Sequence, residues 1–239
     1  MMARLTRLIA LAVLALGAMT PAMAAPPRPH AASAGPNWQA TVTKTAEGGY
    51  LMGNPASGVH LVAYLSYTCP HCADFEAEAD APLRIGMIMP GKGTIEVRPF
   101  LRNPVDLVAS MVATCGSPAK FYGNTRMLLA NQNRWLAPTG QLTEAQKHRW
   151  ESPDFATRMR AVASDLGLYA LMEQRGYTRA ELDRCLADKD EADRIAHRTQ
   201  VAADKEFING TPGFLINGVT LTGTYTWEAL KPQIDARLR

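Results

Sequence analysis

The sequence predicts an α/β fold in which both terminal parts of the chain share one sheet and a helical block is inserted between them. Strand-like apolar segments occur in both terminal parts. Between them, apolar residues recur at helical spacing for about ninety residues. Since β-α-β and β-β-α ends can pair into one sheet, we expect a sheet domain from residues 38–102 and 196–239. Residues 103–195 are expected to form an inserted all-helical domain.

Four segments predict the strands of the first part. Residues 38–45 have the pattern of an edge strand, and residues 50–53 can pair back with it across a glycine turn. Residues 59–66 are apolar on both faces, as a central strand of a mixed sheet requires. Residues 94–101 predict the next strand after a Pro-Gly loop.

The remaining elements have local signals at their ends. A helix is expected after Cys69, and Pro82 should break or kink it near Ala81, because proline lacks an N–H and clashes with the preceding turn. Near the C-terminus, Asn217-Gly218 predicts a two-residue hairpin turn between short strands. Thr226 then has the pattern of an N-cap for the last helix.

The first 24 residues have the pattern of a secretory signal peptide. Arginines precede an apolar segment, and small residues end at Ala24. Residues 25–37, rich in Ala and Pro, predict a disordered leader. After cleavage near Ala24 the protein would lie in an oxidising compartment, which we expect to be the periplasm. The formal net charge of +3 is modest and no Lys/Arg run occurs, so no nucleic-acid partner is expected.

The segment that carries chemistry is Cys69-Pro70-His71-Cys72, at the junction of a predicted strand and helix. Cys69 would lie at the helix N-terminus, where unpaired N–H groups and the helix dipole favour a thiolate. Pro70 suits the first helical turn because its φ is preset. A protonated His71 would stabilise the thiolate further. We therefore expect Cys69 to be the exposed nucleophile and Cys72 the resolving thiol.

Other interpretations of this motif are weaker. A c-type haem site needs Cys-x-x-Cys-His, whereas here His71 lies between the cysteines and Ala73 follows them. A structural zinc site needs two more ligands at similar spacing, and the sequence has no second Cys-x-x-Cys. An inert structural disulfide is the remaining alternative. We therefore expect redox chemistry with no cofactor and no metal.

A second motif lies near the C-terminus, in the segment Gly-Thr-Pro-Gly-Phe-Leu-Ile-Asn-Gly over residues 210–218. Together with Ser-Tyr-Thr-Cys-Pro-His-Cys over residues 66–72, it resembles the DsbA family of periplasmic thiol:disulfide oxidoreductases, including alphaproteobacterial members. The resemblance extends from about Trp38 to the end and implies a thioredoxin-like fold. It also implies that Thr211-Pro212 forms a cis-proline loop that faces the cysteines and pairs with the substrate backbone.

One position departs from the family. Members commonly carry a buried Glu six residues before the first cysteine, where it assists proton transfer, and this chain has Ala63 there. Proton transfer at Cys72 would then use water or another group.

Cys115 and Cys185 lie in the predicted helical block, each on an apolar stripe. They can be two independent core cysteines. In an oxidising compartment a structural disulfide between them is favoured, and a second pair in the helical domain also resembles some members of the family.

The resemblance implies a dithiol oxidase that donates the Cys69–Cys72 disulfide to reduced secreted proteins through a mixed disulfide. A DsbB-like membrane quinone reductase would reoxidise it, and a monomer is expected. One alternative is an isomerase or reductase that another partner keeps reduced. The other is a periplasmic module that binds a soft metal through Cys69, Cys72 and His71.

Overall fold

The computed structural model describes residues 35–238, and residues 36–238 of these belong to one compact unit. The predicted signal peptide and most of the predicted leader lie outside the described residues. No helix within residues 35–238 is long and apolar enough to cross a membrane.

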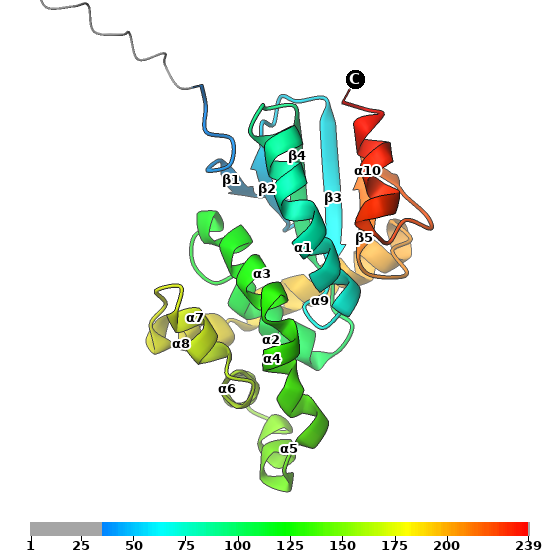
Figure 1. The fold of residues 1–239 in the computed structure, drawn as a ribbon. Coiled ribbons are helices and arrows are strands. Elements are labelled where there is room, and N and C mark those ends of the chain that lie inside the picture. Colours follow the sequence, from blue (N-terminus) through cyan, green and yellow to red (C-terminus); the bar gives the residue numbers. More distant parts are fainter. Residues whose placement is uncertain (1–34, 239) are drawn as a thin grey trace, which may run out of the picture. The chain divides into compact units, whose positions relative to one another are not determined.

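Within residues 35–238 the sheet has six strands, in the spatial order β1 (Val42–Lys44), β2 (Tyr50–Gly53), β4 (Gly93–Pro99), β3 (Val59–Leu65), β5 (Gly213–Ile216) and β6 (Val219–Thr220). Strands β3 and β4 pair in parallel and the other pairs are antiparallel. Both terminal parts therefore contribute to one sheet, which confirms the predicted fold class (Figure 1).

The first strand is shorter than predicted. Of residues 38–45, only Val42–Lys44 pair with β2. The segment before them forms turns instead, in which the N–H of Ala40 bonds to the carbonyl of Asn37. These local bonds use backbone groups that a longer strand would need for pairing.

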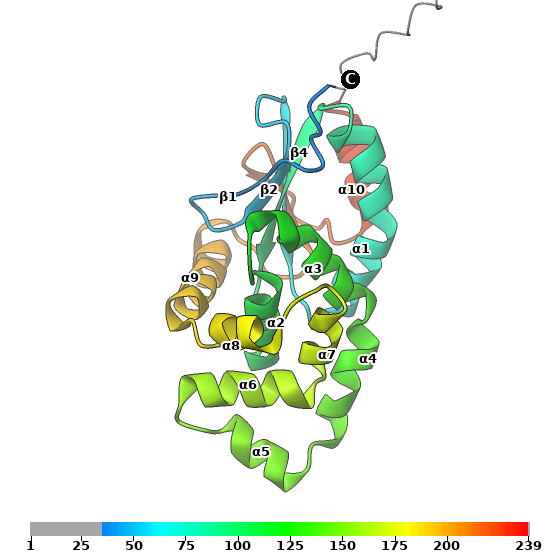
Figure 2. The same cartoon turned by 90° about the vertical axis from the view of Figure 1, so that its left-hand side faces the viewer.

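The helices are α1 (Pro70–Leu83), α2 (Pro104–Ala113), α3 (Phe121–Ala130), α4 (Gln132–Leu136), α5 (Glu144–Trp150), α6 (Phe155–Asp165), α7 (Leu168–Glu173), α8 (Arg179–Leu186), α9 (Lys189–Lys205) and α10 (Trp227–Asp235). Helices α1 and α10 lie on one side of the sheet and α9 on the other (Figure 2). Short 3-10 segments cover Pro118–Lys120 and Ala137–Gln141.

Of the break or kink predicted near Ala81, the break does not occur. Helix α1 continues through Pro82 to Leu83 and then widens into a π-helical segment, Arg84–Ile88. Proline cannot donate the bond that its position in the helix requires, and the wider turn follows directly. Burial of Met87 and Ile88 keeps the segment packed on the core.

The central strand β3 is buried on both faces. Leu61, Ala63 and Leu65 belong to the main core on the α1 side. Val62 and Tyr64 point to the other face, where they pack in a second cluster with residues that include Ala202 of α9. This position under two helical layers explains the apolar run in the sequence.

The helical block shares the main core with the sheet. The ring of Phe121 stacks on Tyr50 with centroids 3.9 Å apart. The hydroxyl of Tyr122 donates to sheet backbone, at 2.6 Å from the carbonyl oxygens of both Tyr50 and Ile95. A disulfide joins Cys115, just after α2, to Cys185 of α8, across 70 positions of sequence.

Candidate active site

The N-terminus of α1 presents the cysteine pair at the end of β3. Cys69 is the N-cap residue, with extended backbone, and Pro70 occupies the first helical turn. The carbonyl of Cys69 accepts the N–H of Cys72 at 3.1 Å. The two cysteines are free thiols in this structure. The local structure therefore follows the pattern expected for a thiolate at a helix N-terminus.

The segment before β5 faces Cys69. Because β5 pairs antiparallel with β3, with Tyr64 opposite Gly213, the preceding residues lie next to the end of β3. The Thr211–Pro212 peptide bond is cis. The Sγ of Cys69 lies 3.1 Å from the carbonyl oxygen of Thr211, to which it donates when it is protonated. The fold thus brings the two sequence motifs together.

The two thiols differ strongly in acidity. The pKa of Cys69 is lowered to about 5, and the largest cause is the hydrogen bond with the Cys72 thiol. Thr211, the N–H of Cys72 and the charge of Arg102 lower this pKa by smaller amounts. Burial opposes this shift. For Cys72, burial is the largest effect and raises the pKa well above the usual range, and the bond and charge of Cys69 raise it further. These shifts favour the thiolate form of Cys69 and the protonated form of Cys72.

Cys69 is less accessible than predicted. We expected an exposed nucleophile, but Cys69 is only 5% exposed, and Cys72 is fully buried. The loop of Thr211 covers the sulfur of Cys69 on one side. Reaction with another thiol therefore needs a partner that fits this narrow opening or a small displacement of the loop.

His71 is exposed. The groups that lower the pKa of Cys69 most are Cys72 and Thr211, not His71. The side chain of His71 lines a cavity of about 310 Å³, whose other walls include Phe75 of α1 and Trp227 of α10. Pro70 is also exposed. The predicted charge effect of His71 on the thiolate stays a prediction, while its place beside this cavity is a finding.

Asp106 of α2 holds the loop that leads into Cys69, a role that the sequence analysis missed. Its carboxylate accepts hydrogen bonds from the hydroxyl of Ser66, from the N–H and hydroxyl of Thr68, and from the N–H of Arg102, at 2.8–3.0 Å. Asp106 is fully buried, and burial raises its pKa despite these bonds. Ser66 in turn directs its N–H at the Sγ of Cys72, at 3.4 Å.

Gln132 of α4 supports the same loop from another direction. Its side-chain amide donates to the carbonyl oxygens of Tyr67 at 2.8 Å and of Cys69 at 2.9 Å. Tyr67 is fully buried, and its hydroxyl is 3.0 Å from that of Thr125 in α3. Three helices of the inserted block therefore fix the active-site loop.

Ala63 is fully buried on the α1 side of β3. Within residues 35–238, no group of three or more His, Cys, Asp or Glu side chains is arranged to hold a metal ion. Cys69, Cys72 and His71 are close in sequence but do not form such a cluster.

Fold and site together define a thioredoxin-like protein with a Cys-x-x-Cys pair opposite a cis-proline. The chain belongs to the thioredoxin family, whose model matches residues 45–236. It is similar to a protein of Rickettsia conorii named as a protein-disulfide oxidoreductase, at 29% identity over 82% of this chain. The chain spans 62% of the length of that relative.

Solved structures show the same fold. A protein-disulfide isomerase from Novosphingobium aromaticivorans has 45% identity and a TM-score of 0.75, over 79% of this chain and 96% of that one. Wolbachia pipientis alpha-DsbA1 has 19% identity and a TM-score of 0.62, over 79% and 89% of the two chains. The fold predicted from the DsbA resemblance is thus confirmed.

Proposed function

We propose that this protein is a thiol:disulfide oxidoreductase that donates a Cys69–Cys72 disulfide to reduced secreted proteins. The observation that carries the proposal is the placement of Cys69, at the N-terminus of α1 and 3.1 Å from the carbonyl oxygen that precedes the cis-proline. The opposite shifts of the two thiols, with the pKa of Cys69 lowered and that of Cys72 raised, agree with it. A stabilised Cys69 thiolate favours the reduced protein and therefore makes its disulfide an oxidant.

The reaction consists of two exchanges. A substrate thiolate attacks the Sγ of Cys69, the Cys69–Cys72 bond breaks, and Cys72 leaves and takes up a proton, as its raised pKa favours. A second substrate thiolate then attacks the substrate sulfur of the mixed disulfide, and Cys69 leaves as a thiolate. Two electrons pass from the substrate dithiol, which becomes a disulfide, to the protein, which becomes a dithiol.

The backbone before Pro212 is suited to hold the substrate during this exchange. Thr211 lies next to Cys69, and an extended substrate segment could pair with its backbone as an added strand. The cavity beside His71 adjoins the same site and offers the substrate a second contact through Trp227 and Tyr225.

The alternative direction is isomerisation or reduction. The Novosphingobium structure with 45% identity is named as a protein-disulfide isomerase, and an isomerase acts from the reduced state. In that case another partner would keep Cys69 and Cys72 reduced. The low pKa of Cys69 is compatible with both directions, because the thiolate is also the attacking group.

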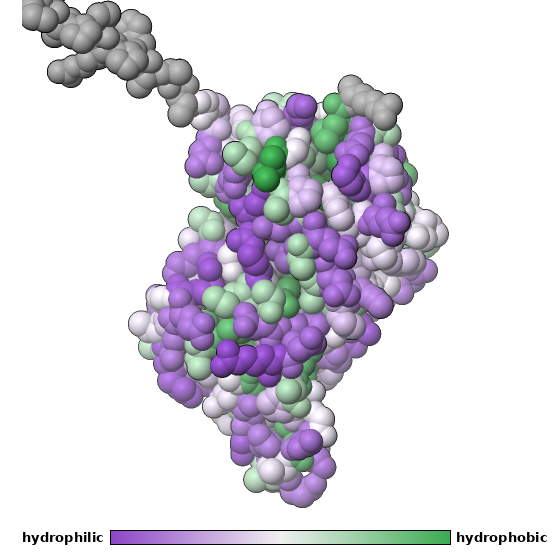
Figure 3. All heavy atoms as spheres, in the orientation of Figure 1, coloured by the Kyte–Doolittle hydropathy of each residue, from purple (hydrophilic) through white to green (hydrophobic). Residues whose placement is uncertain are grey.

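The cellular setting belongs to the same proposal. We infer a periplasmic location after cleavage near Ala24, and reoxidation by a DsbB-like membrane quinone reductase. We also infer a monomer, with which the surface agrees: on the face shown in Figure 3, hydrophobic residues are scattered among hydrophilic ones.

The test is the redox equilibrium of the Cys69–Cys72 pair in glutathione buffers, with the Cys115–Cys185 disulfide intact. A pair that is reduced even in oxidising mixtures supports disulfide donation. A pair that stays oxidised in reducing mixtures would rule it out. Refolding of a scrambled disulfide substrate by the reduced protein would favour the isomerase direction instead.

A further inference from the structure

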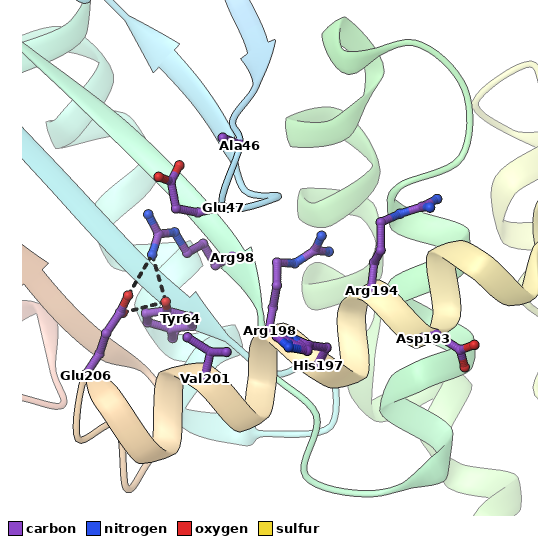
Figure 4. A pocket seen from close by; sticks show the side chains of 10 residues that line it. All are labelled: Ala46, Glu47, Tyr64, Arg98, Asp193, Arg194, His197, Arg198, Val201 and Glu206. Atoms are coloured by element: carbon purple, nitrogen blue, oxygen red, sulfur yellow. Dashed lines mark hydrogen bonds and ion pairs between the residues drawn. The ribbon is translucent and has the colours of Figure 1, made fainter.

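A large cavity lies on the sheet face opposite α1. Its volume is about 530 Å³, and its walls come from the β1–β2 turn, the strands β3 and β4, and helix α9 (Figure 4). None of the active-site residues described above lines it. Its size falls in the range of small-molecule sites. The lining residues are Ala46, Glu47, Tyr64, Arg98, Asp193, Arg194, His197, Arg198, Val201 and Glu206.

Arg98 at the floor of this cavity is fully paired. Its Nε and Nη2 donate to Glu96 at 2.8 and 3.1 Å. Its Nη1 donates to the hydroxyl of Tyr64 at 2.8 Å and to Glu206 at 3.2 Å, as Figure 4 shows. The charge of Arg98 is therefore balanced by acids of the protein itself.

Arg198 of α9 differs from Arg98, because it makes no short ion pair among the described residues. Its side chain is 14% exposed, and the closest ion pair it makes among the described residues is long, with Nη2 3.7 Å from Glu191. Its Nε and Nη2 are shielded from solvent and have no hydrogen-bond partner within residues 35–238. Glu191 accepts bonds from Lys44 and Arg194 at 2.9 Å, both at Oε2, and its Oε1, which has no hydrogen-bond partner within residues 35–238, is the oxygen 3.7 Å from Arg198. One carboxylate therefore faces three cations, Lys44, Arg194 and Arg198, and this buried cluster has more positive than negative charge.

The turn between β1 and β2 lies against the guanidinium of Arg198. Gly48 has φ +77°, and a Cβ added there would lie 1.8 Å from the Nη1 of Arg198. Any other residue at position 48 would be both strained and in collision with the arginine. The guanidinium of Arg198 thus packs closely against this turn at the cavity wall.

We propose that this cavity binds a small carboxylate with a short apolar chain. Arg194, His197 and Arg198 lie on one face of α9, at spacings of three and four residues. A carboxylate in the cavity would offset the positive charge that Glu191 alone does not balance, and guanidinium groups pair well with planar oxoanions. Ala46, Val201 and the aliphatic stems of the arginines would contact the apolar chain.

A single negative charge fits better than a double one. Glu47, Asp193 and Glu206 also line the cavity and would repel a dianion such as phosphate. Glu206 is engaged by Arg98 and Tyr64, and Asp193 by Lys189 at 2.7 Å. Glu47 has no ion pair among the described residues, and it is the acid that could compete with a ligand for Arg198.

The experiment is a titration of the purified, isotope-labelled protein, monitored by NMR at the amide of Gly48 and the Nε–H of Arg198. The probes are sodium butyrate, neutral butyramide and inorganic phosphate at constant ionic strength. We expect saturable shifts with butyrate, none with butyramide and weaker binding of phosphate. Arg198→Met keeps much of the packing and should weaken butyrate binding about tenfold or more, as the loss of a charge-assisted bond implies.

Matched variants complete the test. Arg184→Met, an exposed arginine of α8 outside the cavity, should leave binding unchanged. Glu47→Gln should leave butyrate binding unchanged or make it tighter. If Arg198→Met does not fold, Arg198→Lys is measured instead, and it should weaken butyrate binding by less.

Two results would overturn the proposal: chemical shift changes with butyramide as large as those with butyrate, or an unchanged butyrate affinity in Arg198→Met. Equal binding of phosphate would overturn the carboxylate preference. Because the readout is binding, either result leaves the redox function untouched.

Discussion

The Sγ of Cys69 lies 3.1 Å from the carbonyl oxygen of Thr211, although 142 positions separate the two residues. The contact places the first cysteine of the pair against the backbone that precedes a cis-proline. A substrate that pairs with this backbone would present its sulfur beside Cys69. Binding and exchange would therefore occur at one place.

The acidity of Cys69 can be measured directly. In the reduced protein, thiolate absorbance should titrate with a midpoint near pH 5, far below the ordinary cysteine value of 9.0. Because the folded pKa is lowered, the thiolate stabilises the reduced fold fully above about pH 9. This contribution is lost as the pH falls toward 5. Denaturant unfolding between these pH values should show the loss.

Two variants separate the causes of that acidity. Cys69→Ser should remove the part of the pH dependence that the Cys69 thiol contributes. Cys72→Ala should raise the pKa of Cys69, since the Cys72 thiol makes the largest contribution to lowering it. A midpoint that stays near 5 in Cys72→Ala would assign the shift to the helix terminus instead.

Thr211→Val tests the side chain beside both sulfurs. The Thr211 hydroxyl is buried and has no partner at full hydrogen-bond geometry within residues 35–238. It nevertheless lies near enough to both sulfurs to lower the pKa of each thiol. Valine has nearly the same shape and cannot make this contribution. We expect a higher pKa for Cys69 and a less oxidising disulfide, measured by the thiolate titration and in glutathione buffers. A lower pKa would contradict this interpretation.

Asp106→Ala tests the support of the active-site loop. The change leaves buried donors of Ser66 and Thr68 unpaired, so we expect a loss of about 2–4 kcal/mol in the free energy of unfolding. Asp106→Asn keeps the shape and part of the bonds and should lose less. Asp204→Ala, at an exposed position of α9, is the control and should stay within about 0.5 kcal/mol. Equal effects of Asp106→Ala and Asp204→Ala would show that the loop does not depend on this carboxylate.

Local sequence signals accounted for much of this fold. Asn217 and Gly218 both have positive φ, as the two-residue hairpin turn requires. The hydroxyl of Thr226 accepts the N–H of Ala229, as predicted for a helix cap. In both places a few adjacent residues determine the structure, so the pattern is visible in sequence.

The support of the site was not predictable in this way. Asp106 lies near the start of α2, and in sequence it resembles an ordinary first-turn acid. Its bonds to Ser66 span 40 positions, and those of Gln132 to the loop span more than 60. Such contacts depend on the packing of the helical block. The break expected at Pro82 failed for a related reason, because burial of Met87 and Ile88 holds the chain in helical form.

The Cys115–Cys185 disulfide gives a last prediction that is independent of the active site. It closes a loop of 70 positions, which corresponds to about 4 kcal/mol of stabilisation in the chain-entropy model. The double variant Cys115→Ala/Cys185→Ala should lose about this much in denaturant unfolding. Its thiolate titration at Cys69 should be unchanged, because the disulfide lies in the helical block, between α2 and α8. A change in the Cys69 midpoint would show that the helical block tunes the acidity of the site. An unchanged stability would show that core packing alone holds α8 in place.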